Sequence, residues 1–219
     1  MGFIMESSRP KSVLVIDDHD IVRFGLETLI RASPDLHLIG SAGSLQEGLD
    51  LIKVTRPDLV ITDMGTRDSN GLDTVRAVVA AQEPRVVLVV SIQDEMLYGE
   101  QALLLGARGY LMKESAHAHV IPAALTVLQG GTWVSPRLNA KLVNRMFNSS
   151  RGSSASSDTS LSSRELQVLE LLKSGKSTKE IASLMDVSVR TIDIHRARIK
   201  RKLGLRTGAQ LIAFASSHL

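Results

Sequence analysis

The sequence lacks several features that would place it in common protein classes. It has no cysteine, which excludes disulfide bonds, thiol catalysis and metal sites with thiolate ligands. Its apolar runs reach only five residues, as in 86–90, whereas a membrane-spanning helix needs roughly 18 or more. The N-terminus does not read as a secretory signal, because Arg9, Pro10 and Lys11 follow after only a few apolar residues. We therefore expect a cytosolic protein with no membrane partner.

Charge is unevenly distributed along the 219 residues, although the net charge is only +3. Residues 1–160 hold 15 Lys and Arg against 18 Asp and Glu, whereas residues 161–219 hold 11 against 5. A compact basic C-terminal unit suggests a polyanionic partner for that unit. A chance imbalance on a solvated surface is the alternative at this point.

A serine-rich segment divides the chain. The stretch 148–160 reads NSSRGSSASSDTS and contains no large apolar side chain, which is typical of a flexible linker. We expect an N-terminal extension over 1–11, a first domain over 12–131, a linker over 132–160 and a second domain over 161–219. The linker is predicted to hold a short helix followed by the flexible serine-rich segment.

Upstream of the linker, short β-branched runs alternate with amphipathic stretches. The strands are expected at Ser12–Ile16, Leu36–Ile39, Leu59–Thr62, Val86–Ser91 and Gly109–Met112, and the helices at Ile21–Ala32, Leu45–Thr55, Leu72–Ala81, Glu95–Leu105 and Ala116–Gln129. Because parallel strands need crossover connections, this alternation predicts a doubly wound five-stranded parallel sheet with helices on both faces.

Downstream of the linker every segment has helical spacing. Ser162 and Glu165 form an S-x-x-E capping box at the start of the first helix, and Gly175 is placed to end it. A second helix is expected from about Thr178, a third from Ser188 to about Leu203, and a fourth near Thr207. Two short helices joined by a tight turn predict a helix-turn-helix within a small all-α domain of four helices.

Polar side chains cluster where the predicted parallel strands end. Asp17 and Asp18 follow the first strand, Asp63 the third, and Lys113 the fifth, while Ser91 ends the fourth. In a doubly wound sheet these carboxyl ends form the ligand crevice. Three carboxylates in one crevice suit a hard divalent cation such as Mg²⁺. Lys113 and Ser91 would supply the cation and the hydroxyl that hold a phosphoryl group on a carboxylate.

The spacing of these residues is 45 positions from Asp18 to Asp63 and 50 from Asp63 to Lys113. With these residues at this spacing, region 13–130 resembles a two-component receiver domain. Such domains have a flavodoxin-like fold. The resemblance implies that Asp63 is the phospho-accepting aspartate. It also implies Mg²⁺ binding by Asp18, Asp63 and the backbone carbonyl of Gly65, with Asp17 acting through water.

The same resemblance implies that Ser91 is the switch hydroxyl and that Tyr110 is the aromatic that turns inward with it; a plain core role for Tyr110 is the alternative. Two positions depart from the family pattern. Arg67 stands where a proline is usual, four residues past Asp63, and Ile92 stands where alanine or glycine is common. Ile92 is bulky enough to narrow access to Asp63 and slow phosphotransfer.

The C-terminal region resembles the LuxR-type helix-turn-helix of NarL/FixJ response regulators over about 55 residues. At about 100° per residue, Ile192, Ile199 and Leu203 form the buried stripe of its third helix. The outward face is expected to read bases in the major groove, and charged residues around it are expected to contact phosphates. The residues expected to contact DNA are Thr178, Lys179, Arg190, Asp193, Ile194, Ala197, Arg198, Arg201 and Lys202.

These features together predict a transcriptional regulator that is not an enzyme. A sensor histidine kinase would phosphorylate Asp63 in the presence of Mg²⁺, and the receiver would then favour a homodimer or free the C-terminal domain to bind promoter DNA. Two alternatives remain at this stage. One is an aspartate-nucleophile phosphohydrolase, disfavoured because Gly65, two residues beyond Asp63, offers no acid–base carboxylate. The other is a regulator whose receiver serves as a protein-interaction module without phosphorylation.

Overall fold

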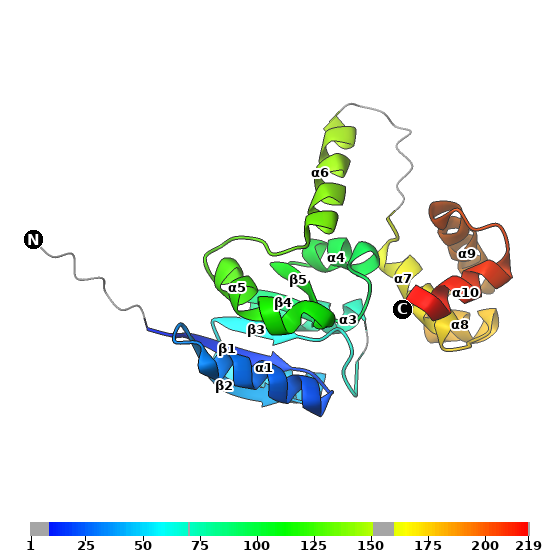
Figure 1. Cartoon of the computed structure of the whole chain (residues 1–219). Coiled ribbons are helices and arrows are strands. Elements are labelled where there is room, and N and C mark those ends of the chain that lie inside the picture. The colour runs from blue at the N-terminus through cyan, green and yellow to red at the C-terminus, as the bar shows by residue number, and fades with distance from the viewer. Residues whose placement is uncertain (1–8, 70, 151–159, 219) are drawn as a thin grey trace, which may run out of the picture. The chain divides into compact units, whose positions relative to one another are not determined.

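The computed structural model describes residues 9–69, 71–150 and 160–218 (Figure 1). Contacts between these residues divide the chain into two compact units. The first unit contains 9–92 and 102–134, and the second contains 93–101 and 135–218. Residues 1–8 of the expected extension and 151–159 of the expected serine-rich linker lie outside the described residues.

The first unit is built on a five-stranded parallel sheet, as the alternation of strands and helices predicted. Its strands are β1 (Lys11–Ile16), β2 (Leu36–Ala42), β3 (Leu59–Thr62), β4 (Val86–Ser91) and β5 (Gly109–Met112), in the spatial order β2-β1-β3-β4-β5. Strand β1 pairs with both β2 and β3. The topological switch point, where a doubly wound sheet places its ligand crevice, therefore lies at the carboxyl end of β1.

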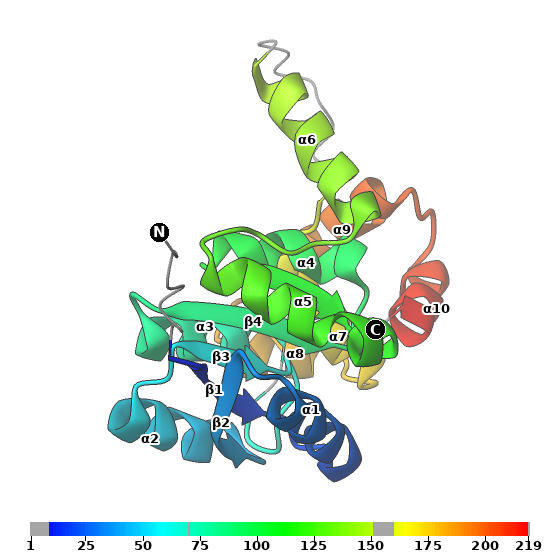
Figure 2. The ribbon, with the colours of Figure 1, turned by 60° about the vertical axis from the view of Figure 1, so that its left-hand side comes forward.

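Helices cover both faces of this sheet (Figures 1 and 2). Helices α1 (Asp20–Ala32) and α5 (Ala116–Leu128) pack on one face, and α2 (Leu45–Thr55) and α3 (Leu72–Gln82) on the other. Because strand side chains alternate, Val13 and Val15 join the first core cluster while Leu14 and Ile16 join the second. Burial on both faces explains the continuous apolar runs of β1 and β4, whereas edge strand β2 contains His37, Gly40 and Ser41 and is only partly buried.

The first unit extends three residues beyond the expected domain end at 131, because the chain returns beside β5 after α5. The Tyr110 amide donates to the Trp133 carbonyl at 2.8 Å, and the Trp133 amide donates to the Arg108 carbonyl at 3.1 Å. A Cβ at Gly109 would lie 2.9 Å from the Trp133 carbonyl oxygen, so glycine permits this close return.

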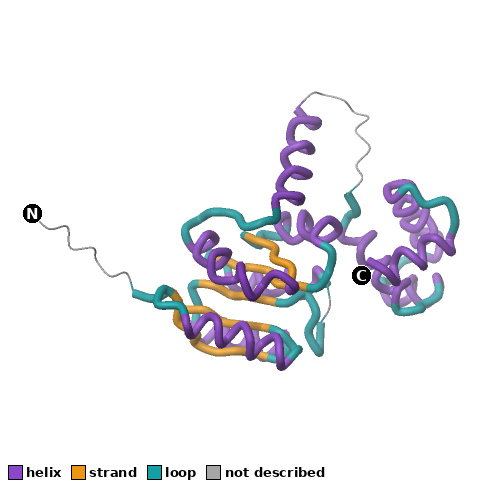
Figure 3. The backbone as a smooth tube through the Cα atoms, in the orientation of Figure 1, coloured by secondary structure: helices purple, strands orange, loops and turns teal. Residues whose placement is uncertain are grey.

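The described residues of the second unit form helices joined by loops and turns, with no strand among them (Figure 3). The helices are most of α4 (Glu95–Leu104), then α6 (Pro136–Ser150), α7 (Ser163–Lys173), α8 (Thr178–Leu184), α9 (Val189–Leu203) and α10 (Gly208–His218). Helix α6 is the helix expected in the linker. It packs on α4 through Leu138, which is fully buried against Gly99, and through the ion pairs of Glu100 with Lys141 and Arg145.

Side-chain caps set the starts of the helix-turn-helix. Ser162 and Glu165 form the predicted capping box of α7, and Ser188 caps α9 by accepting from the Thr191 amide. A second capping box, Ser177 with Glu180, starts α8. These caps satisfy amides that a helix start leaves without intrahelical partners, and so fix where α8 and α9 begin.

None of the helices in the described parts of the chain has the length and hydropathy needed to cross a membrane.

Candidate functional site

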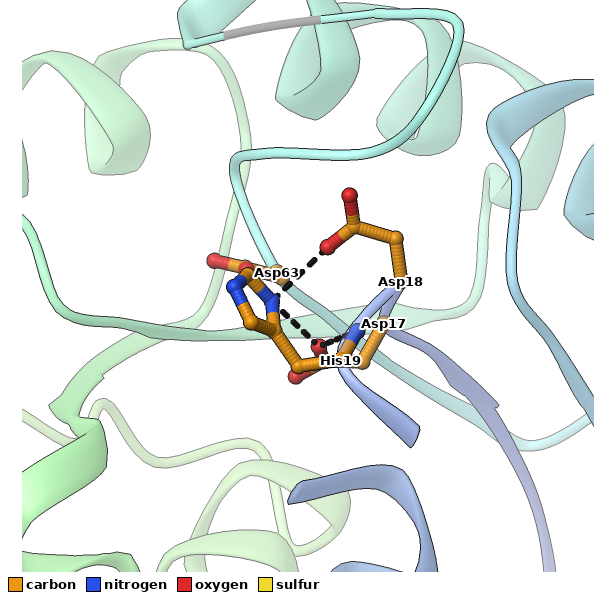
Figure 4. Close-up of side chains that lie close together, drawn as sticks. All are labelled: Asp17, Asp18, His19 and Asp63. Carbon is orange, nitrogen blue, oxygen red and sulfur yellow. Dashed lines mark hydrogen bonds and ion pairs between the residues drawn. The ribbon is translucent and has the colours of Figure 1, made fainter. Parts of the chain in front are cut away.

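The carboxyl ends of β1 and β3 bring Asp17, Asp18 and Asp63 together, as the sequence predicted (Figure 4). One ligand atom from each of these residues and from His19 lies within 4.8 Å of all the others. Asp17 and Asp63 are almost fully buried, whereas the Asp18 side chain is 24% exposed. The cluster therefore has two fixed buried carboxylates and a third carboxylate at the solvent edge.

Hydrogen bonds fix the position of Asp63 next to β1. Its amide donates to the Ile16 carbonyl at 2.8 Å, which continues the β1–β3 pairing beyond the strand end. Its Oδ1 accepts from the Met64 amide at 2.6 Å. With Oδ1 held by the backbone, Oδ2 is the oxygen turned to the neighbouring charged groups.

Lys113 joins the two buried carboxylates. Its Nζ lies 2.7 Å from Asp63 Oδ2 and 2.7 Å from Asp17 Oδ2, and its side chain is 7% exposed. Lys113 follows β5 directly and begins a short 3₁₀ helix, Lys113–Ser115, which the sequence analysis did not foresee. Burial raises the pKa of Asp63 above its usual range, the Lys113 ammonium opposes that rise, and the neighbouring Asp17 adds to it.

The donor set fits a hard divalent cation. Three carboxylates and one ammonium leave two formal negative charges in the site, and carboxylate oxygens are the ligands that Mg²⁺ prefers. Asp18, Asp63 and Asp17 are the residues that would hold it.

Ser91 and Tyr110 lie in the first unit as buried strand residues. Each is 1% exposed, and the Tyr110 hydroxyl donates to Met64 Sδ at 3.3 Å. Tyr110 therefore faces inward and contacts the residue that follows Asp63. This position is compatible with the switch role and with the plain core role, so both interpretations stay open.

The family pattern has proline at the position of Arg67. In this chain, hydrogen bonds of the residues on either side of Arg67 hold the loop after Asp63. Asp68 accepts from the amides of Leu45 and Gln46 at 2.7 and 2.9 Å and so caps the start of α2. Thr66 and Ser69 pair across the turn. The Arg67 side chain is 65% exposed and Ile92 is 64% exposed. The effect of Ile92 on phosphotransfer stays a prediction.

Two residues at this site were missed by the sequence analysis. His19 lies with its Nδ1 2.8 Å from Asp18 Oδ1, and Arg23 donates to the Asp17 carbonyl at 2.7 Å. The signal was their position, since His19 directly follows the Asp17–Asp18 pair and Arg23 is one helical turn further on. Helical spacing alone does not show that either side chain turns back toward β1.

The predicted DNA-contacting face of α9 is exposed, while Ile192 and Ile199 are buried on the opposite face. In the second unit, the exposed members of the predicted set are Lys179, Arg190, Asp193, Ile194, Ala197, Arg198 and Arg201. Thr178 is half-buried, and its hydroxyl accepts from Arg196. The exposed charged and apolar side chains of this set lie on α9, except for Lys179, which lies on α8.

Lys202 differs from the rest of the predicted set. Its side chain is 14% exposed, and its Nζ lies 2.8 Å from Glu165 Oε2 and 2.8 Å from the Ser160 carbonyl. A phosphate contact by Lys202 would have to replace this ion pair.

Comparisons with known proteins match both units. Residues 13–125 match the response regulator receiver domain, and residues 159–215 match the bacterial regulatory proteins of the luxR family. The chain is 30% identical over 208 residues to the oxygen regulatory protein NreC of Staphylococcus carnosus, covering 93% of this chain and 95% of that protein. It is 30% identical over 213 residues to the transcriptional regulatory protein MctR of Rhizobium johnstonii, covering 97% and 96%.

The fold is similar to that of RcsB from Salmonella enterica serovar Typhimurium, in a structure bound to promoter rprA with the phosphomimetic BeF₃⁻. The TM-score is 0.73 at 22% identity, and the match covers 95% of this chain and 100% of that one. At 22% identity, this similarity shows that the two chains share a fold and nothing more.

Proposed function

Since the chain belongs to the two-component response regulators of the NarL/FixJ type, with a receiver domain and a LuxR-type DNA-binding domain, we propose that phosphorylation of Asp63 controls its binding to promoter DNA. It is a transcriptional regulator and not an enzyme, so the phosphohydrolase alternative is set aside. The observation that carries the proposal is the 2.7 Å contact of Lys113 Nζ with Asp63 Oδ2 inside the carboxylate cluster.

In the proposed reaction, an Asp63 oxygen attacks the phosphorus of a phosphohistidine on a sensor kinase. The P–N bond breaks, and the histidine nitrogen leaves with the bonding electron pair. Oδ2 is the attacking oxygen in this proposal, because Oδ1 accepts from the Met64 amide. Lys113 Nζ would then move its contact from the carboxylate to the phosphoryl oxygens, a charge-assisted hydrogen bond in a buried setting.

Bound Mg²⁺ would neutralise charge on the phosphoryl oxygens. We propose Asp18, Asp63 and the backbone carbonyl of Gly65 as its direct ligands, with Asp17 acting through water. The water-mediated role proposed for Asp17 is supported by its burial and by its contact with Lys113. Both leave the Asp17 side chain little freedom to reorient. The role proposed for Asp18 is supported by its 24% exposed side chain, which an ion from solvent would reach first.

We propose that Ser91 then donates to the phosphoryl group and that Tyr110 is the side chain that responds to it. The phosphoryl group shifts the population between two arrangements of the receiver by contacting Ser91 and Lys113 in only one of them. The burial of both residues in strands that end at the site supports this assignment.

The proposed DNA-binding domain is 161–219, and the receiver is 12–131 with its return segment to 134. Helix α9 is proposed to enter the major groove, with Arg190, Asp193 and Arg201 near base edges. Activation through a homodimer is proposed because one short helix reads only a half-site, and a dimer reads two half-sites about one helical turn apart. Because the partner is promoter DNA, the proposed place of action is the cytoplasm.

The test is labelling of the full chain by a small phosphodonor with Mg²⁺, comparing the wild type with Asp63→Asn. We expect acid-labile label on the wild type and none on Asp63→Asn, which is a near isostere. The matched control is Asp50→Asn, an exposed carboxylate on α2, which should label like the wild type. Undiminished labelling of Asp63→Asn would remove Asp63 from its role. No label on any variant would favour a receiver that acts as an interaction module without phosphorylation.

A further inference from the structure

We propose that His19 makes the acidic cluster a site for a borderline divalent transition metal of the Zn²⁺ class, with its Nδ1 as a nitrogen ligand beside the three carboxylates. The inference rests on the proposed function in one respect, namely that Asp17, Asp18 and Asp63 form a divalent-cation site. Its new element is the imidazole, which Mg²⁺ binding does not use.

The imidazole nitrogen of His19 lies at ion-pair distances from the three carboxylates, so a bound metal would replace these contacts (Figure 4). His19 Nδ1 lies 2.8 Å from Asp18 Oδ1, 3.3 Å from Asp17 Oδ1 and 3.9 Å from Asp63 Oδ2. Ligand atoms at about 2.1 Å from a shared zinc lie at most ~4.2 Å apart. Four tetrahedral ligands at this distance from zinc are ~3.4 Å apart, whereas the four atoms lie within 4.8 Å of one another, so Asp18 and His19 must move by about 1 Å toward Asp17 and Asp63.

The His19 and Asp18 side chains must move to bind one ion, and their exposure to solvent allows this movement. The His19 side chain is 58% exposed and that of Asp18 is 24% exposed, whereas Asp17 and Asp63 are nearly fully buried. The two buried carboxylates therefore form a rigid base, and Asp18 and His19 close over it from the solvent side.

The backbone of His19 is held at the cluster independently of its side chain. Its amide donates to Asp17 Oδ1 at 2.9 Å, and its carbonyl accepts from the Arg23 amide in the first turn of α1. His19 occupies the N-cap of α1, yet its side chain makes no cap hydrogen bond. The imidazole is thus directed to the carboxylates rather than to the helix start.

The mixed donor set changes metal preference. Imidazole nitrogen suits Zn²⁺, Ni²⁺ and Co²⁺, whereas Mg²⁺ takes oxygen ligands and keeps several waters. A Zn²⁺-class ion bound beside His19 Nδ1 uses Asp63 Oδ2 as a ligand, and Oδ2 is the oxygen proposed to attack the phosphorus. Such an ion competes with Mg²⁺ and lowers phosphoryl acceptance, and His19 sets how strongly it competes.

The experiment compares Zn²⁺ and Mg²⁺ binding to the full chain by isothermal titration, with wild type, His19→Ala and His37→Ala. His37 is the matched control, because it is exposed and lies near the start of β2, at the end of the sheet away from the carboxylates. We expect His19→Ala to weaken Zn²⁺ binding at least ~10-fold, the loss typical of changes in and around ligand shells. His19→Ala should change Mg²⁺ affinity by a smaller factor than Zn²⁺ affinity, because Mg²⁺ keeps its oxygen ligands, and His37→Ala should change neither.

Visible absorption of the Co²⁺-loaded chain gives a second readout. Nitrogen ligation alters the d–d bands of Co²⁺, so the wild-type spectrum should differ from that of His19→Ala and match that of His37→Ala. Equal Zn²⁺ affinity and equal Co²⁺ spectra in wild type and His19→Ala would overturn the inference. Absence of Mg²⁺ binding in the wild type would instead count against the proposed function, and the His19 comparison would still be decided by Zn²⁺ and Co²⁺.

Discussion

The receiver site and the DNA-binding face use charge in opposite ways. In the receiver, Asp17, Asp63 and Lys113 are 1%, 4% and 7% exposed and contact one another. On α9, Arg190 and Arg201 are exposed to solvent. Buried charges interact strongly and depend on one another, whereas exposed charges are screened and nearly additive. Removing a cationic side chain should therefore lower the stability of the fold much more in the receiver site than on α9.

The largest effect is expected from removing the buried cation. Lys113→Ala leaves two carboxylates facing each other without their cation, and breaking a buried ion pair in this way costs about 3 kcal/mol or more. Arg201→Ala, the exposed counterpart, should change stability by less than about 0.5 kcal/mol. Urea denaturation of both variants in metal-free buffer measures the difference. Equal free energies of unfolding for the two variants would show that the buried and the exposed cation contribute alike to stability.

The next effect concerns sequence recognition by α9. Arg190→Ala and Asp193→Ala should each relax preference at particular base pairs at a cost of about 1–3 kcal/mol, because a base-edge contact is lost. Competition binding against operator variants with single base-pair changes measures this. If Arg190→Ala weakens binding to all sequences alike, Arg190 contacts a phosphate and not a base. If Asp193→Ala strengthens binding to all sequences alike, Asp193 repels phosphates and does not read a base.

A third comparison separates two lysines that the sequence placed in one group. Lys179→Ala should flatten the slope of log K against log salt by about 0.9, the value for one phosphate contact. Lys202→Ala should leave that slope unchanged and instead lower stability by about 1 kcal/mol, because it leaves the 2%-exposed Glu165 without its cation. Salt-dependent binding and thermal unfolding of both variants give the answer. A flattened slope for Lys202→Ala would restore it as a phosphate contact.

The smallest effect is a pH dependence in the second unit. Burial opposes ionisation of Glu165, but hydrogen bonds from Lys202 and Ser162 outweigh it and hold the pKa of Glu165 below its usual range. A lowered folded-state pKa stabilises the fold above the ordinary carboxyl pKa and loses that contribution as pH falls through the folded value. Glu165→Gln should therefore lower stability at neutral pH and reduce its decline in acid. Thermal unfolding between pH 7 and pH 3 measures this, with exposed Asp193→Asn as the control.

Local patterns were sufficient for most of the fold. The bounds predicted for β3, β4, β5 and α2 match the structure, because apolar runs, turn residues and the Ser44 cap mark these ends within a few positions. Strand β2 continues to Ala42, three residues past the expected end, since Gly40 and Ser41 gave no apolar signal while pairing with β1 carries the strand on. Pairing partners distant in sequence thus decided what the local pattern did not.

The candidate site divides in the same way. The sequence determined by itself that Asp17, Asp18 and Asp63 would meet, because parallel strands place their carboxyl ends at one edge. It likewise determined which face of α9 is exposed, because helical spacing fixes that face. Only the tertiary structure decided that His19 turns to the carboxylates and that Lys202 turns inward to Glu165. The direction of a long or exposed side chain depends on groups brought near by folding, and neither periodicity nor spacing encodes those neighbours.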